Sequence, residues 1–398
     1  MNREDFAILK NNLVYFDNGA TTLKPNQVVN SIVNYYTKYT ANAHRGDYKN
    51  SKIVDDLYEG TRKKVKEFIN AKHSSEIVFT SGTTDSLNDI IFGYFKYKLH
   101  KDDEVLLTES EHASNVVGWY ALAKEIGIKI RFMDLNENNE LTLDSVKKTI
   151  TPHTKVISIA HITNVIGDVR DINAISKLAH ENNMLLVVDA AQSIAHNKID
   201  VQESDIDFLA FSAHKMYGPT GVGVLYGKFD LLKDLVPTNY GGGMNAIFTK
   251  DGYYELKDIP TRLEAGTPNI EGVIGLGTAI DYINSIGIDK IAKYEHELRH
   301  YLIDKLKQLD FIELYNKDND GTIVSFNIKG VFSQDTAVYL DKYNIAVRAG
   351  NHCAKMLGNL FHINNTCRIS LSFYNTKEEV DLLINVLNNS ANIWKEIL

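Results

Sequence analysis

Cysteine, proline and concentrated basic charge are all scarce in this sequence. Its 398 residues include 2 cysteines and 6 prolines, and 43 Lys and Arg stand against 51 Asp and Glu. Two cysteines are too few for a disulfide-rich scaffold or a four-cysteine zinc site. The formal net charge of −8 argues against nucleic acid as the main partner, because phosphate backbones are bound by clustered Lys and Arg.

Long apolar runs are missing as well. No window approaches the roughly 18 apolar residues that a membrane-spanning helix needs. The opening MNREDFAILKNN carries two acids and breaks its apolar runs early, unlike a secretory signal. We therefore expect a cytoplasmic protein with no membrane partner. Cys353 and Cys367 are close enough in sequence for one disulfide, but thiols in that compartment usually stay reduced.

The middle of the chain alternates short apolar strands with amphipathic helices. Strands are expected at 76–80, 104–108, 128–134, 154–162, 185–190, 208–212 and 221–227. Continuous apolar strands separated by helices indicate an α/β fold with a mostly parallel sheet covered on both faces.

The pattern changes near residue 270, where long helices precede strand-like segments and a closing helix. At roughly 150 residues per domain, the length suggests two or three units. We expect a large α/β domain over 14–265 and a smaller α+β domain over 266–398, which the N-terminal arm 1–13 joins. The stretch 239–268 is expected to be a connection. A helix is expected near the N-terminus, because one stripe collects Val28, Val29, Ile32, Val33 and Tyr36.

Polar residues follow several of the expected strands. They are Thr83, Thr84, Asn164, Asp189, Ser212, His214 and Lys215. Because ligands of an open parallel sheet bind at the carboxyl ends of its strands, we expect these side chains to line one crevice.

The residue types in this set match the needs of a pyridoxal ring. Lys215 offers an amine for the aldehyde, Asp189 a carboxylate for the ring nitrogen, and Gly82 to Thr84 donors for a phosphate. Taken singly, an Asp after a strand is often a turn residue and a lysine there is usually solvated. The inference therefore depends on their joint occurrence. The glycines of 221–227 have the wrong spacing for a dinucleotide loop.

A family resemblance extends this hypothesis along nearly the whole chain. The motifs, in order, are FDNGATT (16–22), NAHRG (42–46), SGTTDSLN (81–88), SEHASN (110–115), VVDAAQ (187–192), FSAHKMYGPTGVGVLYG (211–227), RLEAGTPN (262–269), RAGNHCA (348–354) and CRISLSFYNT (367–376). The chain resembles the class V aminotransferases of the fold type I pyridoxal-phosphate enzymes. It looks most like the group II, Suf-type cysteine desulfurases, which also show selenocysteine lyase activity. The resemblance implies a seven-stranded-type sheet and bound pyridoxal 5'-phosphate.

The resemblance also implies roles around the cofactor. Lys215 would hold the cofactor covalently, His112 would stack on its ring and assist proton transfer, and Gln192 would bond the ring hydroxyl. Thr83, Thr84, Ser212 and His214 would bind its phosphate. Thr267 would reach the phosphate of the neighbouring subunit, which implies a homodimer with shared active sites. Without the resemblance, Gln192 and Thr267 would be taken for surface and turn residues.

Substrate contacts are implied on the other side of the same site. Arg368 would clamp the α-carboxylate, since a guanidinium suits a planar carboxylate, with Asn164 as its helper. Arg348, His44 and Arg45 match family positions around the substrate. No metal ligands are assigned from the sequence.

Cys353 indicates the reaction. A thiolate can attack sulfur and carry it away as a persulfide, and the short polar loop around Cys353 is typical of group II. Cys367 begins an apolar strand and is expected to be buried filler. Asn351, Lys355 and Met356 depart from the usual pattern of the family. They leave open the conformation of the Cys353 loop and the identity of the sulfur acceptor.

The resemblance thus implies conversion of L-cysteine to L-alanine, with the sulfur passed as a persulfide to a Suf-type acceptor for iron–sulfur cluster assembly. Alternatives are a selenocysteine lyase, a cysteine-sulfinate desulfinase, a transaminase or another class V enzyme, which need Lys215 but tolerate loss of Cys353. A scaffold without activity is a third alternative. It is disfavoured because Lys215, Asp189, Cys353 and Arg368 are all intact.

Overall fold

The largest layer of the protein is a sheet of seven strands. The computed structural model describes residues 3–44, 46–315, 319–358, 365–390 and 393. In spatial order the strands are β2 (Ile77–Thr80), β8 (Gly223–Gly227), β7 (Phe208–Ser212), β6 (Leu185–Asp189), β5 (Thr154–Ala160), β3 (Glu104–Leu107) and β4 (Lys129–Phe132). β7, β6, β5, β3 and β4 run parallel, and only β8 runs against its neighbours β7 and β2. The predicted α/β fold with a mostly parallel sheet is confirmed.

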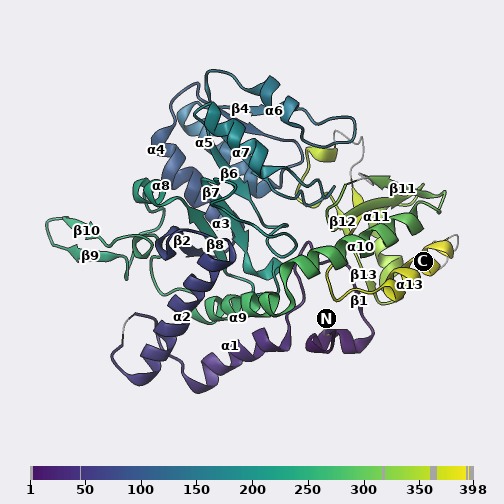
Figure 1. Cartoon of the computed structure of the whole chain (residues 1–398), viewed down its shortest axis with the longest axis horizontal. Helices are drawn as coiled ribbons and strands as arrows, with labels where there is room; N and C mark the ends of the chain where they lie inside the picture. Colours follow the sequence, from purple (N-terminus) through teal and green to yellow (C-terminus); the bar gives the residue numbers. More distant parts are fainter. Residues whose placement is uncertain (1–2, 45, 316–318, 359–364, 391–392, 394–398) are drawn as a thin grey trace.

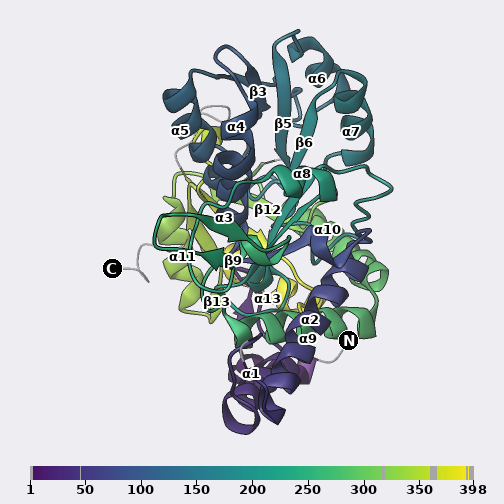
Figure 2. The ribbon, with the colours of Figure 1, turned by 90° about the vertical axis from the view of Figure 1, so that its left-hand side faces the viewer.

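Two apolar clusters cover the two faces of this sheet, because side chains alternate along each strand. Leu186 and Val188 of β6 point into one cluster, and Val187 points into the other. The first cluster includes side chains of α1 (Asn26–Lys38), α2 (Lys49–Phe68), α6 (Leu143–Thr149), α7 (Ile172–Glu181) and α9 (Ile270–Ile286). The second includes side chains of α3 (Thr83–Asn88), a π-helical segment (Asp89–Phe95), α5 (Val117–Ile126) and α8 (Phe229–Asp234). Figures 1 and 2 show the helices on either side of the sheet.

The C-terminal part builds its own antiparallel sheet and core. Its strands, in order, are β11 (Ile312–Tyr315), β12 (Ile323–Ile328), β15 (Thr366–Ser370) and β14 (Arg348–Gly350). The helices α10 (Ile288–Leu306), α11 (Ser333–Asp341) and α13 (Lys377–Asn388) contribute to its apolar cluster. Val14 and Phe16 join this cluster, and β1 (Val14–Tyr15) pairs with β13 (Ile345–Ala346). The division at residue 265 stays a prediction, and α9 packs in the first core.

Short helical pieces connect these elements. They are the 3-10 turns Arg3–Asp5, Ala7–Asn11, Ser74–Glu76, Ala113–Asn115, Ala213–Lys215 and Thr261–Leu263, and the helix α4 (Lys96–Lys98). The α3 helix, the π-helical segment and α4 follow one another directly, so Thr83 to Lys98 forms one helical stretch. Among the helices that the structure describes, none combines the length and apolar character needed to cross a membrane.

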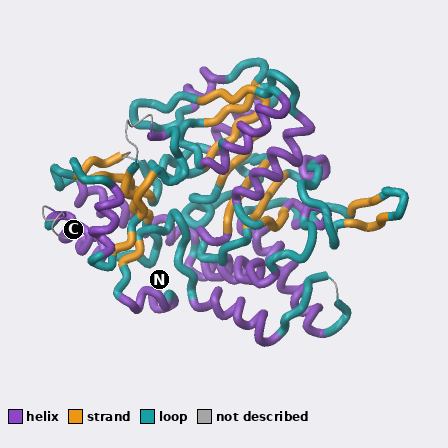
Figure 3. The backbone as a smooth tube through the Cα atoms, turned by 180° about the vertical axis from the view of Figure 1, so that it is seen from behind, coloured by secondary structure: helices purple, strands orange, loops and turns teal. Residues whose placement is uncertain are grey.

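Two segments place apolar side chains in solvent. The stretch 239–268, expected to be a connection, contains a hairpin of β9 (Asn245–Phe248) and β10 (Tyr254–Leu256). Figure 3 shows it projecting away from the rest of the molecule, and Phe248 at its end is 76% exposed. On α1, Val29, Val33 and Tyr36 are also exposed, so the predicted stripe is buried only in part.

The backbone of β8 lies very close to the residue before α3, so a methyl group added to Gly223 should disturb the fold. A Cβ on Gly223 would lie 2.6 Å from the carbonyl carbon of Gly82, a backbone atom that cannot rotate away. We expect Gly223→Ala to lower the free energy of unfolding by about 1–3 kcal/mol in urea titrations. Gly60→Ala on α2 is the control, since its Cβ meets nothing within 4 Å and Ala favours a helix. Equal stability of the two variants would contradict the prediction.

Candidate active site

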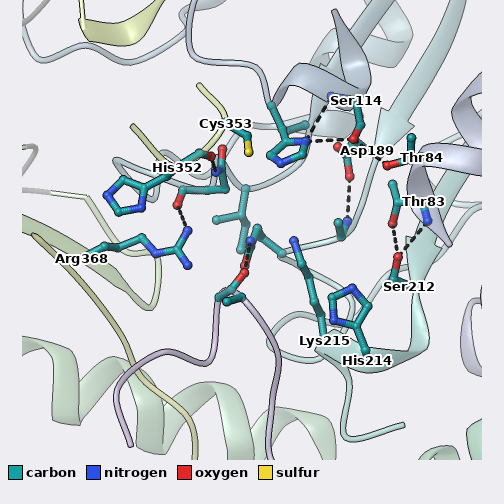
Figure 4. Close-up of a pocket in the computed structure, with 18 of the residues that line it drawn as sticks. Thr83, Thr84, Ser114, Asp189, Ser212, His214, Lys215, His352, Cys353 and Arg368 are labelled. Carbon is teal, nitrogen blue, oxygen red and sulfur yellow. Dashed lines mark hydrogen bonds between the residues drawn. The ribbon is translucent and has the colours of Figure 1, made fainter. Parts of the chain in front are cut away.

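A cavity of about 310 Å³ opens where the carboxyl ends of the central strands face the second sheet (Figure 4). Twelve of the fifteen residues proposed from the sequence line it. They are Thr83, Thr84, His112, Asn164, Asp189, Gln192, Ser212, His214, Lys215, Arg348, Cys353 and Arg368. Thr267 is not among the lining residues; it is exposed and accepts a hydrogen bond of 3.4 Å from Asn42.

Lys215 and Asp189 form the buried centre of the cavity. Asp189 is the last residue of β6, and Lys215 ends the 3-10 turn after the neighbouring strand β7. Burial lowers the pKa of the Lys215 amine to about 8, although the Asp189 carboxylate partly offsets this effect. Burial likewise raises the pKa of Asp189 to about 6. This site therefore holds a reactive amine, and its carboxylate would gain a favourable partner if a cationic ring nitrogen bound beside it.

A second group of polar atoms surrounds the start of α3. The Thr83 backbone N–H donates to Ser212 Oγ at 2.7 Å, and the two hydroxyls also lie 2.7 Å apart. The Thr84 hydroxyl bonds that of Ser114 at 2.7 Å. Burial, together with Lys215 and Lys24, lowers the pKa of His214 to about 4. Hydroxyls and backbone N–H groups at the beginning of a helical stretch suit a phosphate group.

His112 lines the cavity as a neutral imidazole. Its pKa is lowered to about 4, first by burial and then by the nearby Lys215 and Arg368. Its Nδ1 accepts from the Ser114 backbone N–H at 3.1 Å, which leaves the proton on Nε2.

A buried ion pair fixes the segment that carries His112. Glu111 precedes it and receives Arg170 Nη1 at 2.5 Å, both side chains being fully buried. The other Glu111 oxygen accepts from the Ala160 backbone N–H at 2.8 Å, on the end of β5. Removal of either partner would leave an uncompensated buried charge, so this pair keeps the loop in one position.

Arg368 reaches the cavity from β15 of the second sheet. Its Nη1 donates to the Asn164 carbonyl at 2.8 Å, and its Nη2 lies 3.4 Å from Asp17 Oδ1. Burial lowers its pKa to about 10, so the guanidinium remains charged at neutral pH. Arg348 is half exposed and forms an ion pair with Asp17. Its Nε lies 3.0 Å from Asp17 Oδ1, and its Nη2 lies 3.0 Å from Asp17 Oδ2.

Cys353 sits on a tightly held loop at the mouth of the cavity. His352 and Cys353 both have left-handed backbone, with φ of 51° and 58°. The Cys353 N–H donates to Asn351 Oδ1 at 3.1 Å, so the unusual Asn351 stabilises this turn. The Cys353 carbonyl accepts from the Ala113 N–H at 2.8 Å, which ties the loop to the His112 segment. Its side chain is exposed.

Cys367 is buried, as expected, with its sulfur 3.0 Å from the Ser333 carbonyl. Burial raises the pKa of its thiol to about 12. His44 does not line the cavity and lies 3.3 Å from a Glu59 oxygen. Arg45 falls outside the described residues.

Sequence reasoning assigned no role to three residues that help to form the site. Asp17 holds both arginines, Ser114 holds His112, and His352 lines the wall beside Cys353. Each lies inside a motif quoted for the resemblance, so position within the motif was the available signal. Their contacts depend on segments far away in the sequence, which a motif does not reveal.

Three buried atoms on the cavity wall have no hydrogen-bond partner among the described residues. They are Asn164 Oδ1, His352 Nδ1 and Arg368 Nε. A buried polar atom without a partner costs about 1–3 kcal/mol, so the wall is suited to a polar ligand. The amine, carboxylate and hydroxyl groups described above fit pyridoxal phosphate in the same cavity.

Comparison with known proteins identifies the family. The family described as "Aminotransferase class-V" matches residues 14–383. The chain belongs to the class-V aminotransferases. A family member from Halalkalibacterium halodurans, named "Probable cysteine desulfurase", is 41% identical and covers 97% of this chain and 95% of its own. A protein of the same name from Staphylococcus aureus is also 41% identical, covering 98% and 96%.

Two solved structures share the fold over nearly the whole chain. The apo structure of a cysteine desulfurase from Thermococcus onnurineus NA1 has a TM-score of 0.93 and 38% identity, and covers 97% of this chain and 96% of its own. The cysteine desulfurase CsdA from Escherichia coli, solved with an S-sulfonic acid, has a TM-score of 0.93 and 35% identity, covering 98% of both chains.

The lowered pKa of Lys215 predicts how the protein without cofactor takes up pyridoxal phosphate. Only the neutral amine attacks an aldehyde, so the rate of covalent uptake should rise with pH, reach half its maximum near pH 8 and then level off. Absorbance stopped-flow measurements from neutral to alkaline pH would follow this rate. The Lys215→Ala variant is the control and should show no covalent uptake. A rate still rising near pH 10.4, the ordinary value for lysine, would contradict the prediction.

Proposed function

We propose that this class-V enzyme is a pyridoxal-phosphate-dependent cysteine desulfurase, which converts L-cysteine to L-alanine and holds the released sulfur as a persulfide on Cys353. The observation that carries the proposal is that Cys353, Lys215 and Arg368 line one cavity although they come from three separate segments. The family members with the same printed name, from Halalkalibacterium halodurans and Staphylococcus aureus, support it.

The residues that would hold the cofactor follow from their positions. Lys215 would bind its aldehyde carbon, Asp189 its ring nitrogen, and Thr83, Thr84, Ser212 and His214 its phosphate. His112 would stack on the ring. Gln192, whose Nε2 donates to the Gly19 carbonyl at 2.9 Å, would bond the ring hydroxyl. Bound there, pyridoxal phosphate supplies an electron sink that lowers the cost of negative charge at the Cα of an amino acid.

The chain's own residues orient the substrate and move its protons. Arg368 binds the α-carboxylate, because its guanidinium is buried and charged and its Nε is free of partners in the described structure. Asn164 holds Arg368 through its carbonyl and presents its own buried Oδ1. The Lys215 amine would accept the proton from Cα and give it up again later in the reaction, since an amine with a pKa near 8 both accepts and donates protons near neutral pH.

Cys353 takes the sulfur. Cys353 Sγ gives up its proton and forms a bond to the substrate sulfur while the substrate C–S bond breaks. The electron pair of the broken bond stays with the substrate Cβ, which takes up one proton, so the remaining three-carbon unit leaves as alanine. The enzyme is then left with a persulfide, and no external oxidant or reductant is needed. Because Cys353 is exposed, a thiol of an acceptor protein can reach this persulfide. We assign the acceptor to the Suf type, the process to iron–sulfur cluster assembly and the location to the cytoplasm.

A shared active site would account for Thr267. It is exposed and lies outside the cavity of its own chain, so a role at a phosphate requires a second subunit. The exposed apolar residues Val29, Val33 and Tyr36 of α1 offer a surface for such a subunit. We therefore propose a homodimer in which each chain completes the site of the other.

Replacing Cys353 separates desulfuration from the other reactions of class-V enzymes. We expect Cys353→Ala to keep the absorbance of the bound cofactor but to lose release of sulfide and alanine from L-cysteine by roughly 10³-fold or more, as when other nucleophiles are removed. Both products should be measured with a thiol reductant present. The matched control is Cys367→Ala, because its thiol is buried away from the cavity. Sulfide release at the wild-type rate from Cys353→Ala would instead favour a selenocysteine lyase or another class-V reaction.

The dimer is tested by placing a charge on α1. We expect the wild type to have twice the mass of one chain in light scattering, and Val33→Asp to shift it toward the monomer and weaken cofactor retention. Val338→Asp is the control, since Val338 is 50% exposed on α11 and Val33 is 49% exposed on α1. A wild type that is monomeric across the micromolar range would rule out the shared site.

A further inference from the structure

Three side chains that could bind a metal ion lie together on the surface, and none of them lines the cavity. His296 and His300 lie on α10, and Asp320 lies in the turn before β12. The two imidazole Nε2 atoms are 3.0 Å apart. The nearest Asp320 oxygen, Oδ1, is 3.2 Å from His296 Nε2 and 4.0 Å from His300 Nε2. All three side chains are exposed, by 47%, 50% and 71%.

The sequence explains why the two histidines meet. Residues 296–300 read HELRH, which places the histidines four apart on one face of a helix. This spacing is that of the two zinc-binding histidines in the H-E-x-x-H pattern. No metal ligands were expected from the sequence. Without a third ligand, the spacing alone would be weak evidence for a site.

The geometry of the three atoms fits a four-coordinate metal. With Zn–N and Zn–O distances of about 2.0–2.1 Å, a tetrahedral ion separates its ligand atoms by roughly 3.3–3.4 Å. The separations of 3.0, 3.2 and 4.0 Å bracket this value. Two imidazoles and one carboxylate also form a ligand set that zinc prefers, with water able to fill the fourth position.

Buried contacts on both sides hold the ligands in place. On α10, Glu295 next to His296 accepts a hydrogen bond of 2.7 Å from His196 Nδ1, and both residues are buried. Arg299 next to His300 donates to Asn319 Oδ1 at 2.9 Å. Asn319 in turn donates to the Ile166 carbonyl, so the residue before Asp320 is fixed against the loop that follows β5. Asp320 is therefore presented by an anchored turn.

We propose that His296, His300 and Asp320 bind one divalent transition metal ion of the zinc type. The ion would tie α10 to the turn before β12. Asn319 of this turn and Ser325 of β12 already bond the carbonyls of Ile166 and Val165, next to Asn164. We assign binding and stabilisation, and no hydrolysis, because all three ligands are exposed and a hydrolytic metal needs an enclosed position for its substrate.

Zinc titration of the holoenzyme tests the site. Cys353 is replaced by Ser in every sample, because an exposed thiol also binds zinc. After treatment with a chelator, calorimetry with Zn²⁺ should show one site per chain. His296→Ala and His300→Ala should each weaken zinc binding at least tenfold, and Asp320→Asn should also weaken it. His100→Ala is the matched control, since His100 is 87% exposed and lies elsewhere.

Two further readouts distinguish the metal site from a simple histidine pair. Zn²⁺ should raise the melting temperature of the parent and of His100→Ala but not that of His300→Ala, and a chelator should reverse the rise. Co²⁺ should give the strong visible bands of tetrahedral coordination only when both histidines are present. Zinc affinity within twofold of the control in His296→Ala and His300→Ala, or no binding by the parent, would overturn the proposal and leave a hydrogen-bonded histidine pair.

Discussion

The burial of Lys215 beside Asp189 is the constraint on which the rest of the site depends. Taking an amine and a carboxylate out of water disfavours both charged forms, which lowers the pKa of Lys215 to about 8 and raises that of Asp189 to about 6. The parallel strands β6 and β7 impose this burial, because they end side by side between two layers of helices. The cofactor chemistry that we propose needs the same dry position.

The second sheet and the loop next to it supply an arginine and a cysteine to the cavity. Arg368 comes from β15, and Cys353 from the loop after β14, yet both line the cavity at the ends of the central strands. Asp17 and Asn164 join the two parts, since they hold Arg368 by its two terminal nitrogens. A change in how the two parts pack would therefore alter the position of the substrate carboxylate and of the sulfur acceptor together.

The proposed zinc site belongs to the same junction. Asn319 and Ser325 of the C-terminal part bond the carbonyls of Ile166 and Val165, immediately after Asn164. Metal binding at Asp320 would thus reinforce a contact on which the substrate side depends. A bound metal would therefore change the stability of this junction and would take no part in the chemical reaction.

The sequence by itself determined the alternating strands and helices of 76–227 and, by resemblance, twelve of the lining residues of the cavity. These features are local, because the spacing of apolar residues and the residues of a motif can be recognised within a short stretch of sequence. Tertiary structure alone decided the partners of Asp17, the tie between the Cys353 loop and Ala113, and the meeting of Asp320 with His296 and His300. Each of these depends on contacts or packing between distant segments, whose relative placement no local pattern encodes.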